Sequence, residues 1–163
     1  MVSRPADIVY FGLGSNLGDR EATLRLAIEK LQAPDLRLLR VSSIYETEPI
    51  GLKEQPWFLN MVAAFESTLA PHELLSRAQQ VEQELGRIRT VTNGPRTIDV
   101  DLLLCGDTIV RSAELDVPHP RYRERRFVLE PLVELDAALK DPVTQERLSD
   151  ILAGLRGQEV RKR

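Results

Sequence analysis

Apolar residues along the chain follow two different spacings, which predicts a mixture of strands and helices. Short runs rich in β-branched and aromatic residues, typical of strands, occur at 8–12, 36–47, 58–65 and 97–104. Between these runs, apolar side chains recur three or four positions apart in two segments, 19–34 and 71–85, which predicts amphipathic helices. Asp19 is suited to cap the start of the first helix, and Gly86 is suited to end the second.

The order strand–helix–strand–strand–helix–strand predicts the fold. It is the split βαβ pattern of a ferredoxin-like α+β fold, βαββαβ, in which an antiparallel sheet carries its helices on one face. Weaker helical patterns and an arginine-rich segment after Gly106 predict a C-terminal extension. The 163 residues suit a single domain, 1–163, with a core over about 7–156 and a frayed polar tail at 157–163.

Composition and charge exclude several classes of protein. Twenty-two basic residues against 25 acidic ones give a formal charge of −3, so the chain as a whole does not attract nucleic acid or an anionic membrane. No apolar stretch approaches the roughly 20 residues that span a bilayer, and the first residues lack the apolar centre of a signal peptide. The single cysteine, Cys105, cannot form an internal disulfide. We therefore expect a cytoplasmic monomer that acts on small molecules, without nucleic-acid or membrane partners.

A pair of carboxylates is the densest chemical signal in the chain. It lies in the segment Gly94-Pro-Arg-Thr-Ile-Asp-Val-Asp101. Because side chains alternate faces along a strand, Asp99 and Asp101 project to one face, within about 7 Å of each other. Such a pair repels itself unless a divalent cation lies beside it, and oxygen ligands that share their metal with phosphates suit magnesium. The alternative is a solvent-facing acidic pair, against which the structured flanks of the segment weigh.

Basic residues around this strand indicate a site for phosphate. The arginines concerned are Arg87, Arg89, Arg96, Arg121, Arg123, Arg125 and Arg126. Guanidinium groups bind phosphate oxygens through paired N–H groups. His119, held between two prolines, is a further donor, unless its role is structural. The alternative for the arginines is a solvated surface in which Glu124 and Glu130 pair with them, with Arg121 and Arg123 as its first members.

An aromatic ring and an amide lie two residues apart on the third predicted strand. Phe58 and Asn60 share one face, so the pair is suited to stack on a flat heterocycle and to bind its edge. The alternative is an ordinary core phenylalanine beside an asparagine at a strand end. The glycine-rich segment 12–18 follows a strand, but it lacks the Gly-Lys-Ser/Thr ending of a P-loop and the dinucleotide spacing, so no phosphate is assigned to it.

Six segments in this order resemble a known family. They are Gly14-Ser-Asn-Leu-Gly18, Tyr45-Glu-Thr-Glu-Pro-Ile-Gly51, Gln55-Pro-Trp-Phe-Leu-Asn60, Gly86-Arg-Ile-Arg89, Gly94-Pro-Arg-Thr-Ile-Asp-Val-Asp101 and Val117-Pro-His-Pro120. Together they resemble 6-hydroxymethyl-7,8-dihydropterin pyrophosphokinases over about residues 9–132. The resemblance implies transfer of pyrophosphate from ATP to the hydroxymethyl oxygen of the pterin, with release of AMP, in folate biosynthesis.

The resemblance also implies roles for individual residues. Asp99 and Asp101 would hold two magnesium ions, and Arg87, Arg89 and Arg96 would take part in catalysis. The positions that match ATP contacts are Gln79, Glu82, Arg87, Arg96, His119 and Arg125. The positions that match pterin contacts are Thr47, Pro49, Ile50, Phe58, Asn60 and Phe127.

Three positions depart from the family pattern, and two other functions compete with it. Residue 93 is Asn where many relatives carry a large residue, residue 120 is Pro where some have tyrosine, and residue 48 is Glu where some have proline. These changes concern affinity and loop closure rather than the metal pair. An RNA-recognition domain would need a basic sheet face with stacked aromatic residues, against which the carboxylate pair weighs. A nucleotide sensor without turnover is the second alternative.

Overall fold

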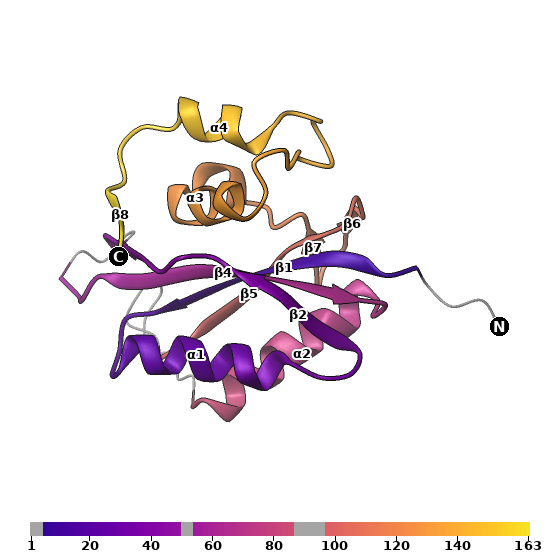
Figure 1. Cartoon of the computed structure of the whole chain (residues 1–163), viewed down its shortest axis with the longest axis horizontal. Coiled ribbons are helices and arrows are strands. Elements are labelled where there is room, and N and C mark those ends of the chain that lie inside the picture. The colour runs from indigo at the N-terminus through magenta and orange to yellow at the C-terminus, as the bar shows by residue number, and fades with distance from the viewer. Residues whose placement is uncertain (1–4, 50–53, 87–96) are drawn as a thin grey trace.

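An antiparallel sheet forms the centre of the computed structural model, which describes residues 5–49, 54–86 and 97–163. Its strands are β1 (Asp7–Ser15), β2 (Leu36–Val41), β3 (Tyr45–Thr47), β4 (Phe58–Ser67), β5 (Asp99–Cys105) and β8 (Val160–Lys162). They lie in the order β5-β1-β4-β3-β8, and β2 also pairs with β4 (Figure 1). This mixed architecture of helices on an antiparallel sheet is the one that the apolar spacing predicts.

Two helices cover one face of the sheet. They are α1 (Arg20–Leu31) and α2 (Pro71–Glu84), and Figure 1 shows both on the same side. The Asp19 carboxylate accepts a hydrogen bond from the Ala22 amide at 3.1 Å, which confirms the predicted cap. Gly86 follows α2 with a φ of +74°, the left-handed conformation expected at a helix end. Alternate residues of β1, namely Val9, Phe11 and Leu13, are buried against these helices.

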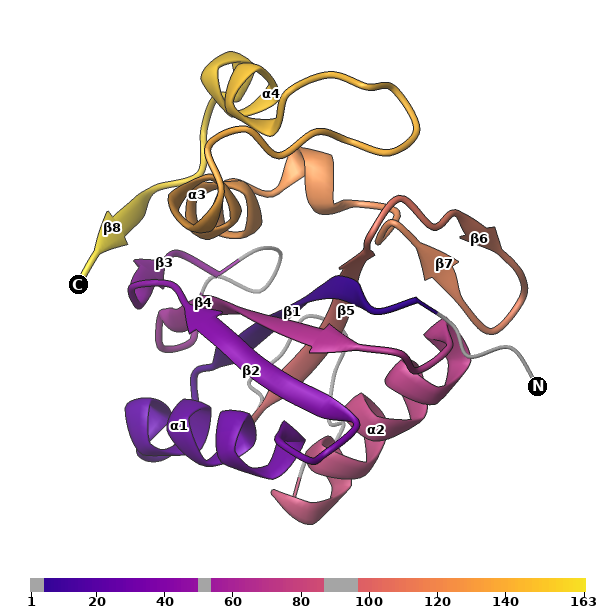
Figure 2. The same cartoon turned by 45° about the vertical axis from the view of Figure 1, so that its right-hand side comes forward.

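A third helix covers the opposite face. It is α3 (Arg126–Leu135), which packs against the side of the sheet that carries Tyr10, Val62 and Ala64. The helix α4 (Leu148–Gly154) lies outside α3 (Figure 2). The short elements β6 (Val110–Arg111), β7 (Asp116–Val117) and η1 (Tyr122–Glu124) precede α3. The prediction of helices on one face, which concerned the βαββαβ core, holds for α1 and α2. The predicted C-terminal extension adds α3 on the other face, because that face is also apolar and must be covered.

The segment 36–47, predicted as one strand, is divided into β2 and β3. Ser42 interrupts it: its amide donates to the Val62 carbonyl at 2.8 Å, and its hydroxyl accepts from the Val62 amide at 2.9 Å. The hydroxyl thus replaces the backbone carbonyl as the partner of β4, so the backbone of the segment is free to turn. An apolar pattern does not reveal this substitution of one acceptor for another.

The end of the chain also differs from its prediction. We expected 157–163 to fray, but Val160–Lys162 forms β8 and pairs antiparallel with β3. The reason is the open edge of β3, whose backbone groups need partners that a polar tail supplies as well as an apolar one. Whether the chain forms one domain stays a prediction.

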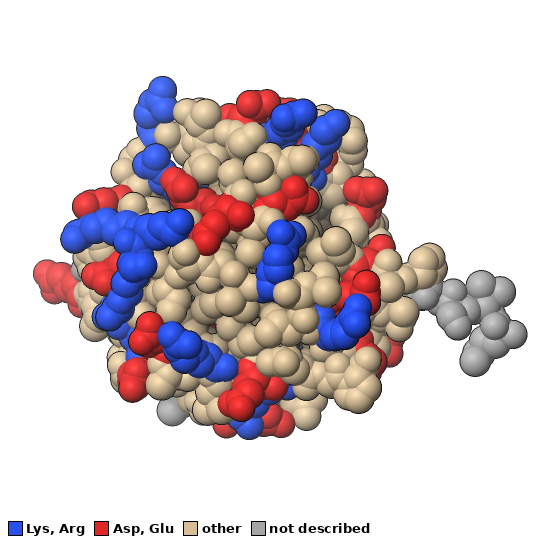
Figure 3. All heavy atoms as spheres, in the orientation of Figure 1, with Lys and Arg blue, Asp and Glu red and all other residues tan. Residues whose placement is uncertain are grey.

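The surface and the helices add two further observations. On the face in Figure 3, basic and acidic side chains intermingle and surround uncharged surface. Among the helices of the described ranges, none combines the length and the apolar character needed to cross a bilayer.

Candidate functional site

A row of three cross-strand partners runs across the neighbouring strands β5, β1 and β4. Asp99 of β5 lies opposite Gly14 of β1, and Gly14 lies opposite Asn60 of β4. Two residues earlier in β1, Gly12 is the cross-strand partner of Asp101. Residues paired in this way project to the same face, so both carboxylates and the Asn60 amide lie on the face that α3 covers. The prediction that Asp99 and Asp101 share a face is confirmed.

The two carboxylates are only partly buried, although the strand that carries them is well packed. Val100, between them, is 4% exposed and belongs to the core on the α1–α2 side. Glu82 of α2 approaches the same strand, and its carboxylate accepts the Val100 amide at 2.9 Å. Among the residues that the structure describes, β5 ends the order of the sheet, so none of their strands pairs with this amide on its outer side. Glu82 therefore supplies the hydrogen bond that an edge strand lacks and ties α2 to the carboxylate pair.

Gln79, predicted beside Glu82 in the nucleotide region, is exposed on α2. No cluster of three or more His, Cys, Asp or Glu side chains capable of enclosing a metal occurs within the ranges that the structure describes. A magnesium ion at Asp99 and Asp101 would therefore draw part of its coordination from water and phosphate oxygens, as magnesium sites that bind polyphosphates do.

The Asn60 amide is held in place by β3. Its Nδ2 atom donates to the Thr47 hydroxyl at 2.7 Å, and both side chains are buried. Phe58 is the cross-strand partner of Thr47, so its half-buried ring lies on the same face. Pro49, two residues after Thr47, is also buried. The structure thus brings together three of the six residues that the resemblance assigns to the pterin, Thr47, Phe58 and Asn60, and Pro49 follows close behind them in the chain.

The fifth pterin residue, Phe127, comes from a different part of the chain. It lies in the first turn of α3 and packs against the core on that side of the sheet. The Arg125 guanidinium carbon lies 5.7 Å from the centre of the Phe127 ring, a cation–π distance. Because α3 contacts both β3 and β4, the helix that carries Phe127 lies over the strands that carry Thr47 and Asn60 (Figure 2).

A hydrogen-bond cluster that the sequence interpretation missed joins α3 to β3. The Glu134 carboxylate accepts from the Tyr45 hydroxyl at 2.6 Å, from the Ser43 amide at 3.0 Å and from the Ser43 hydroxyl at 2.8 Å. Burial by itself would raise the pKa of Glu134, but these hydrogen bonds hold it below its ordinary value. No spacing in the sequence indicated this cluster, because α3 and β3 are far apart along the chain.

His119 lies beside β5 and is uncharged. Its amide donates to the Leu103 carbonyl at 3.0 Å, and its Nδ1 atom accepts from the Arg121 amide at 3.2 Å. Burial lowers the pKa of His119 to about 4, and the positive charges of Arg125 and Arg121 act in the same direction. The ring is therefore neutral near pH 7, and because Nδ1 is an acceptor, its proton lies on Nε2.

The remaining arginines divide into different environments. Arg123, which we expected on the surface, pairs instead with the fully buried Asp141 and so links η1 to the loop before α4. Arg126 lies 3.5 Å from Glu130, one turn further along α3, which agrees with the surface pairing considered from the sequence. Ile50, Arg87, Arg89 and Arg96, together with Asn93, lie outside the described residues.

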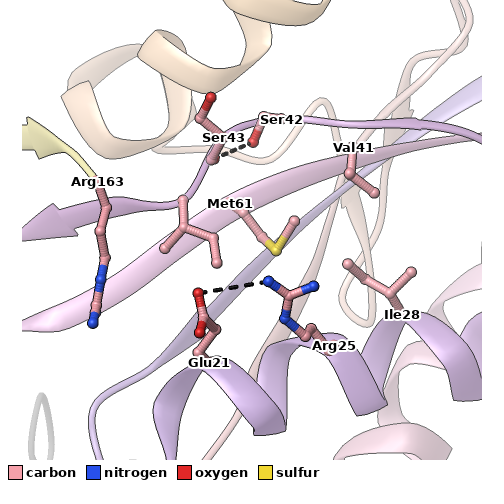
Figure 4. Close-up of a pocket in the computed structure, with 9 residues that line it drawn as sticks. Glu21, Arg25, Ile28, Val41, Ser42, Ser43, Met61 and Arg163 are labelled. Atoms are coloured by element: carbon pink, nitrogen blue, oxygen red, sulfur yellow. Dashed lines mark hydrogen bonds and ion pairs between the residues drawn. The ribbon is translucent and has the colours of Figure 1, made fainter.

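A groove of about 470 Å³ lies elsewhere, between α1 and the junction of β2 and β3 (Figure 4). Ile28 and Met61 form part of its floor, and Arg25 points across it, 3.7 Å from Glu21. None of its lining residues belongs to the set predicted from the sequence. Its floor is on the α1 side of the sheet, so it is separate from the row of Asp99, Gly14 and Asn60.

Comparisons with known proteins agree with these features. Residues 10–137 match the family model described as 7,8-dihydro-6-hydroxymethylpterin-pyrophosphokinase (HPPK). The chain is 50% identical over 130 residues to the 2-amino-4-hydroxy-6-hydroxymethyldihydropteridine pyrophosphokinase of Bacillus subtilis, covering 79% of this chain and 78% of that protein. It is 43% identical over 138 residues to the folic acid synthesis protein fol1 of Pneumocystis carinii, covering 85% of this chain.

Solved structures share the fold at low sequence identity. The wild-type HPPK-DHPS of Plasmodium falciparum with pteroate superimposes with a TM-score of 0.71 at 13% identity, over 94% of this chain and 43% of that one. The chain thus spans less than half of that structure and, at 19%, about a fifth of the Pneumocystis protein. It spans most of the Bacillus relative.

Proposed function

Because this chain belongs to the 7,8-dihydro-6-hydroxymethylpterin-pyrophosphokinase family, we propose that it transfers the pyrophosphoryl group of ATP to 6-hydroxymethyl-7,8-dihydropterin in folate biosynthesis. One observation carries the proposal. The carboxylates of Asp99 and Asp101 share a face of the sheet with the Asn60 amide, and only β1 separates them. A metal-binding pair and a group suited to bind a heterocycle are thus adjacent, as transfer between a bound triphosphate and a bound alcohol requires.

The pterin occupies the side of the site formed by β3, β4 and α3. Phe58 and Phe127 stack on the two faces of its ring, and Asn60, Thr47, Pro49 and Ile50 bind its edge. The support is the described cluster of Thr47, Phe58 and Asn60, in which the amide is already held by a hydrogen bond of 2.7 Å. An amide that is fixed before binding loses little conformational entropy when the substrate arrives.

ATP and magnesium occupy the side formed by β5. The donor set fits magnesium, since two carboxylates on one strand supply hard oxygen ligands and leave positions for phosphate oxygens. We assign two magnesium ions to Asp99 and Asp101, and the ATP contacts to Gln79, Glu82, Arg87, Arg96, His119 and Arg125. Glu82 also binds the backbone of β5, at Val100. His119, neutral and protonated on Nε2, is suited to donate a hydrogen bond to a phosphate oxygen.

In the reaction, the hydroxymethyl oxygen bonds to the β-phosphorus of ATP as the bond from that phosphorus to the oxygen bridging the α-phosphate breaks. AMP leaves with that oxygen, and the hydroxyl proton is released. Magnesium, when bound, neutralises the phosphate charge and lowers the pKa of the attacking hydroxyl. The chain holds the two substrates in line, and Arg87, Arg89 and Arg96 stabilise the charge that develops on the phosphates.

We extend the proposal to the organisation of the protein. The spatial order β5-β1-β4 followed by β2, with antiparallel neighbours, supports a ferredoxin-like βαββαβ core. A cytoplasmic monomer with small-molecule substrates is consistent with the single cysteine and with the balanced charge of the chain.

Release of AMP from ATP tests the function. We expect AMP only when 6-hydroxymethyl-7,8-dihydropterin and magnesium are both present, and none after addition of a chelator. AMP release that does not depend on the pterin would contradict the proposal, as would release of ADP instead. Tight binding of nucleotide without any turnover would favour the sensor alternative.

A further inference from the structure

Gly14 lies directly beneath the Asn60 side chain. A Cβ atom built on Gly14 would lie 2.5 Å from Asn60 Oδ1 and 3.7 Å from Phe58 Cδ1. Two atoms of this kind do not approach within 3.0 Å, so the Asn60 amide occupies the volume that any other residue at position 14 would fill. The same amide donates to Thr47 on its far side. The Asn60 amide thus has the Thr47 hydroxyl on one side and, on the other, the space that Gly14 leaves open.

Backbone conformation does not explain this glycine. Gly14 lies within β1, and it is not among the glycines with positive φ, which are Gly18, Gly86, Gly106 and Gly157. An alanine would adopt the backbone of an ordinary strand residue without strain. Only the space above its Cα distinguishes position 14.

We propose that Gly14 is a positioning residue of the pterin site, which selects the orientation of the Asn60 amide by leaving out a side chain. Its other cross-strand partner is Asp99, so the amide lies across β1 toward the metal-binding carboxylates. In this orientation Nδ2 is directed to Thr47, and Oδ1 lies over Gly14, where the Phe58 ring is also close. A flat ring can then lie against Phe58 with its edge at Asn60. The inference rests on the proposed function, since it concerns how that site recognises the pterin.

An alanine at position 14 would displace Oδ1 and rotate the amide away from Thr47. The pterin would lose its fixed partner, whereas ATP, bound along β5, would not. We expect Gly14→Ala to raise the dissociation constant of the pterin at least about tenfold, equivalent to one lost hydrogen bond, and to leave that of ATP within about twofold.

Gly12→Ala is the matched control. Gly12 lies on the same strand and the same face, but its Cβ would meet Leu103 Cδ1 at 3.2 Å, an apolar side-chain end that is able to shift. This variant tests whether any methyl group added to this face of β1 weakens pterin binding. We expect pterin affinity close to that of the wild type.

The experiment measures binding of 6-hydroxymethyl-7,8-dihydropterin by calorimetry in the presence of magnesium and α,β-methylene-ATP, which does not react. The proteins are the wild type, Gly14→Ala, Gly12→Ala, Asn60→Ala and the double variant Gly14→Ala/Asn60→Ala. We expect Asn60→Ala to weaken pterin binding. In the double variant, Gly14→Ala should weaken pterin binding little further than Asn60→Ala alone, because both changes remove the same contact.

Each outcome bears on a different claim. If Asn60→Ala leaves pterin affinity unchanged, the proposed pterin site is wrong. If Asn60→Ala weakens binding but Gly14→Ala does not, or if the two losses are independent, the role of Gly14 is refuted and the site stands. If Gly14→Ala is too unstable for binding measurements, thermal unfolding provides a second test. Truncating Asn60 removes the clash with the new methyl group, so the double variant should have a higher melting temperature than Gly14→Ala. A double variant no more stable than Gly14→Ala would also refute the inference.

Discussion

Two hydrogen bonds join Glu48 to the backbone of Glu159, one from the Glu48 amide and one to the Glu48 carboxylate. The Glu48 amide donates to the Glu159 carbonyl at 3.3 Å, and the Glu159 amide donates to the Glu48 carboxylate at 2.8 Å. Gln158 adds a hydrogen bond from its side chain to the Glu48 carbonyl at 3.1 Å. The C-terminal strand β8 is therefore attached to the segment that carries Thr47 and Pro49, at a position where the sequence departs from the proline of some relatives.

Replacing Glu48 by proline should detach this strand. Proline has neither the amide nor the carboxylate, so both hydrogen bonds to Glu159 are lost, and we expect a loss of about 1–3 kcal/mol in the free energy of unfolding. Hydrogen exchange at residues 160–162 should become faster, and pterin affinity should fall. Glu48→Gln keeps the amide and an acceptor oxygen and is the control. Unchanged exchange at β8 in Glu48→Pro would show that Glu48 does not hold the strand.

Replacing either site carboxylate should abolish most of the activity while the fold is retained. Both Asp99 and Asp101 are partly exposed, so Asp99→Asn and Asp101→Asn should unfold at temperatures close to that of the wild type. Loss of magnesium should lower turnover at least about a hundredfold, or roughly 2.7 kcal/mol of barrier. Asp107→Asn, in the exposed turn after β5, is the control. Near-normal turnover in both site variants would remove the carboxylates from the mechanism.

His119 should make the protein less stable in acid. Its folded pKa of about 4 lies below the ordinary value of 6.5, so between these values the unfolded chain binds the proton and the folded chain does not. Its contribution to stability is complete above about pH 6.5 and is lost as the pH falls toward about 4. We expect His119→Gln to lose less stability than the wild type over this range, as measured by urea unfolding. If the free energy of unfolding changed equally with pH in both proteins, the assignment would be contradicted. His72→Gln, on the exposed side of α2, is the control.

Glu134 should stabilise both the fold and the pterin site. In Glu134→Ala the buried Tyr45 hydroxyl loses its acceptor, which should lower the free energy of unfolding by about 1–3 kcal/mol. Pterin affinity should also fall, because Tyr45 and Glu134 join the strand of Thr47 to the helix of Phe127. Glu130→Ala, which removes an ion pair on the same helix, should change stability by less than about 0.5 kcal/mol. Additive losses in Glu134→Ala and Tyr45→Phe would mean that the two side chains are not coupled.

Several parts of the site were predictable from sequence. The alternation of side chains along a strand placed Asp99 and Asp101 on one face, and the same rule placed Phe58 with Asn60. The Glu134 cluster, the Arg123–Asp141 pair and the contact between Gly14 and Asn60 were not predictable, because each joins residues from elements that are separate in the sequence. The roles of Arg87, Arg89 and Arg96 stay predictions.

The sequence by itself determined the helices α1 and α2 with their caps, the strands β1, β4 and β5, and the faces of these strands, since these follow from the spacing of apolar residues and from local hydrogen bonds. Only the tertiary structure decided that α3 covers the second face, that the polar C-terminus adds a strand to the sheet, and that Gly14 leaves room for Asn60. These features depend on which backbone edges and which volumes are left unfilled once the sheet has formed, and that is a property of the assembled elements rather than of any one segment.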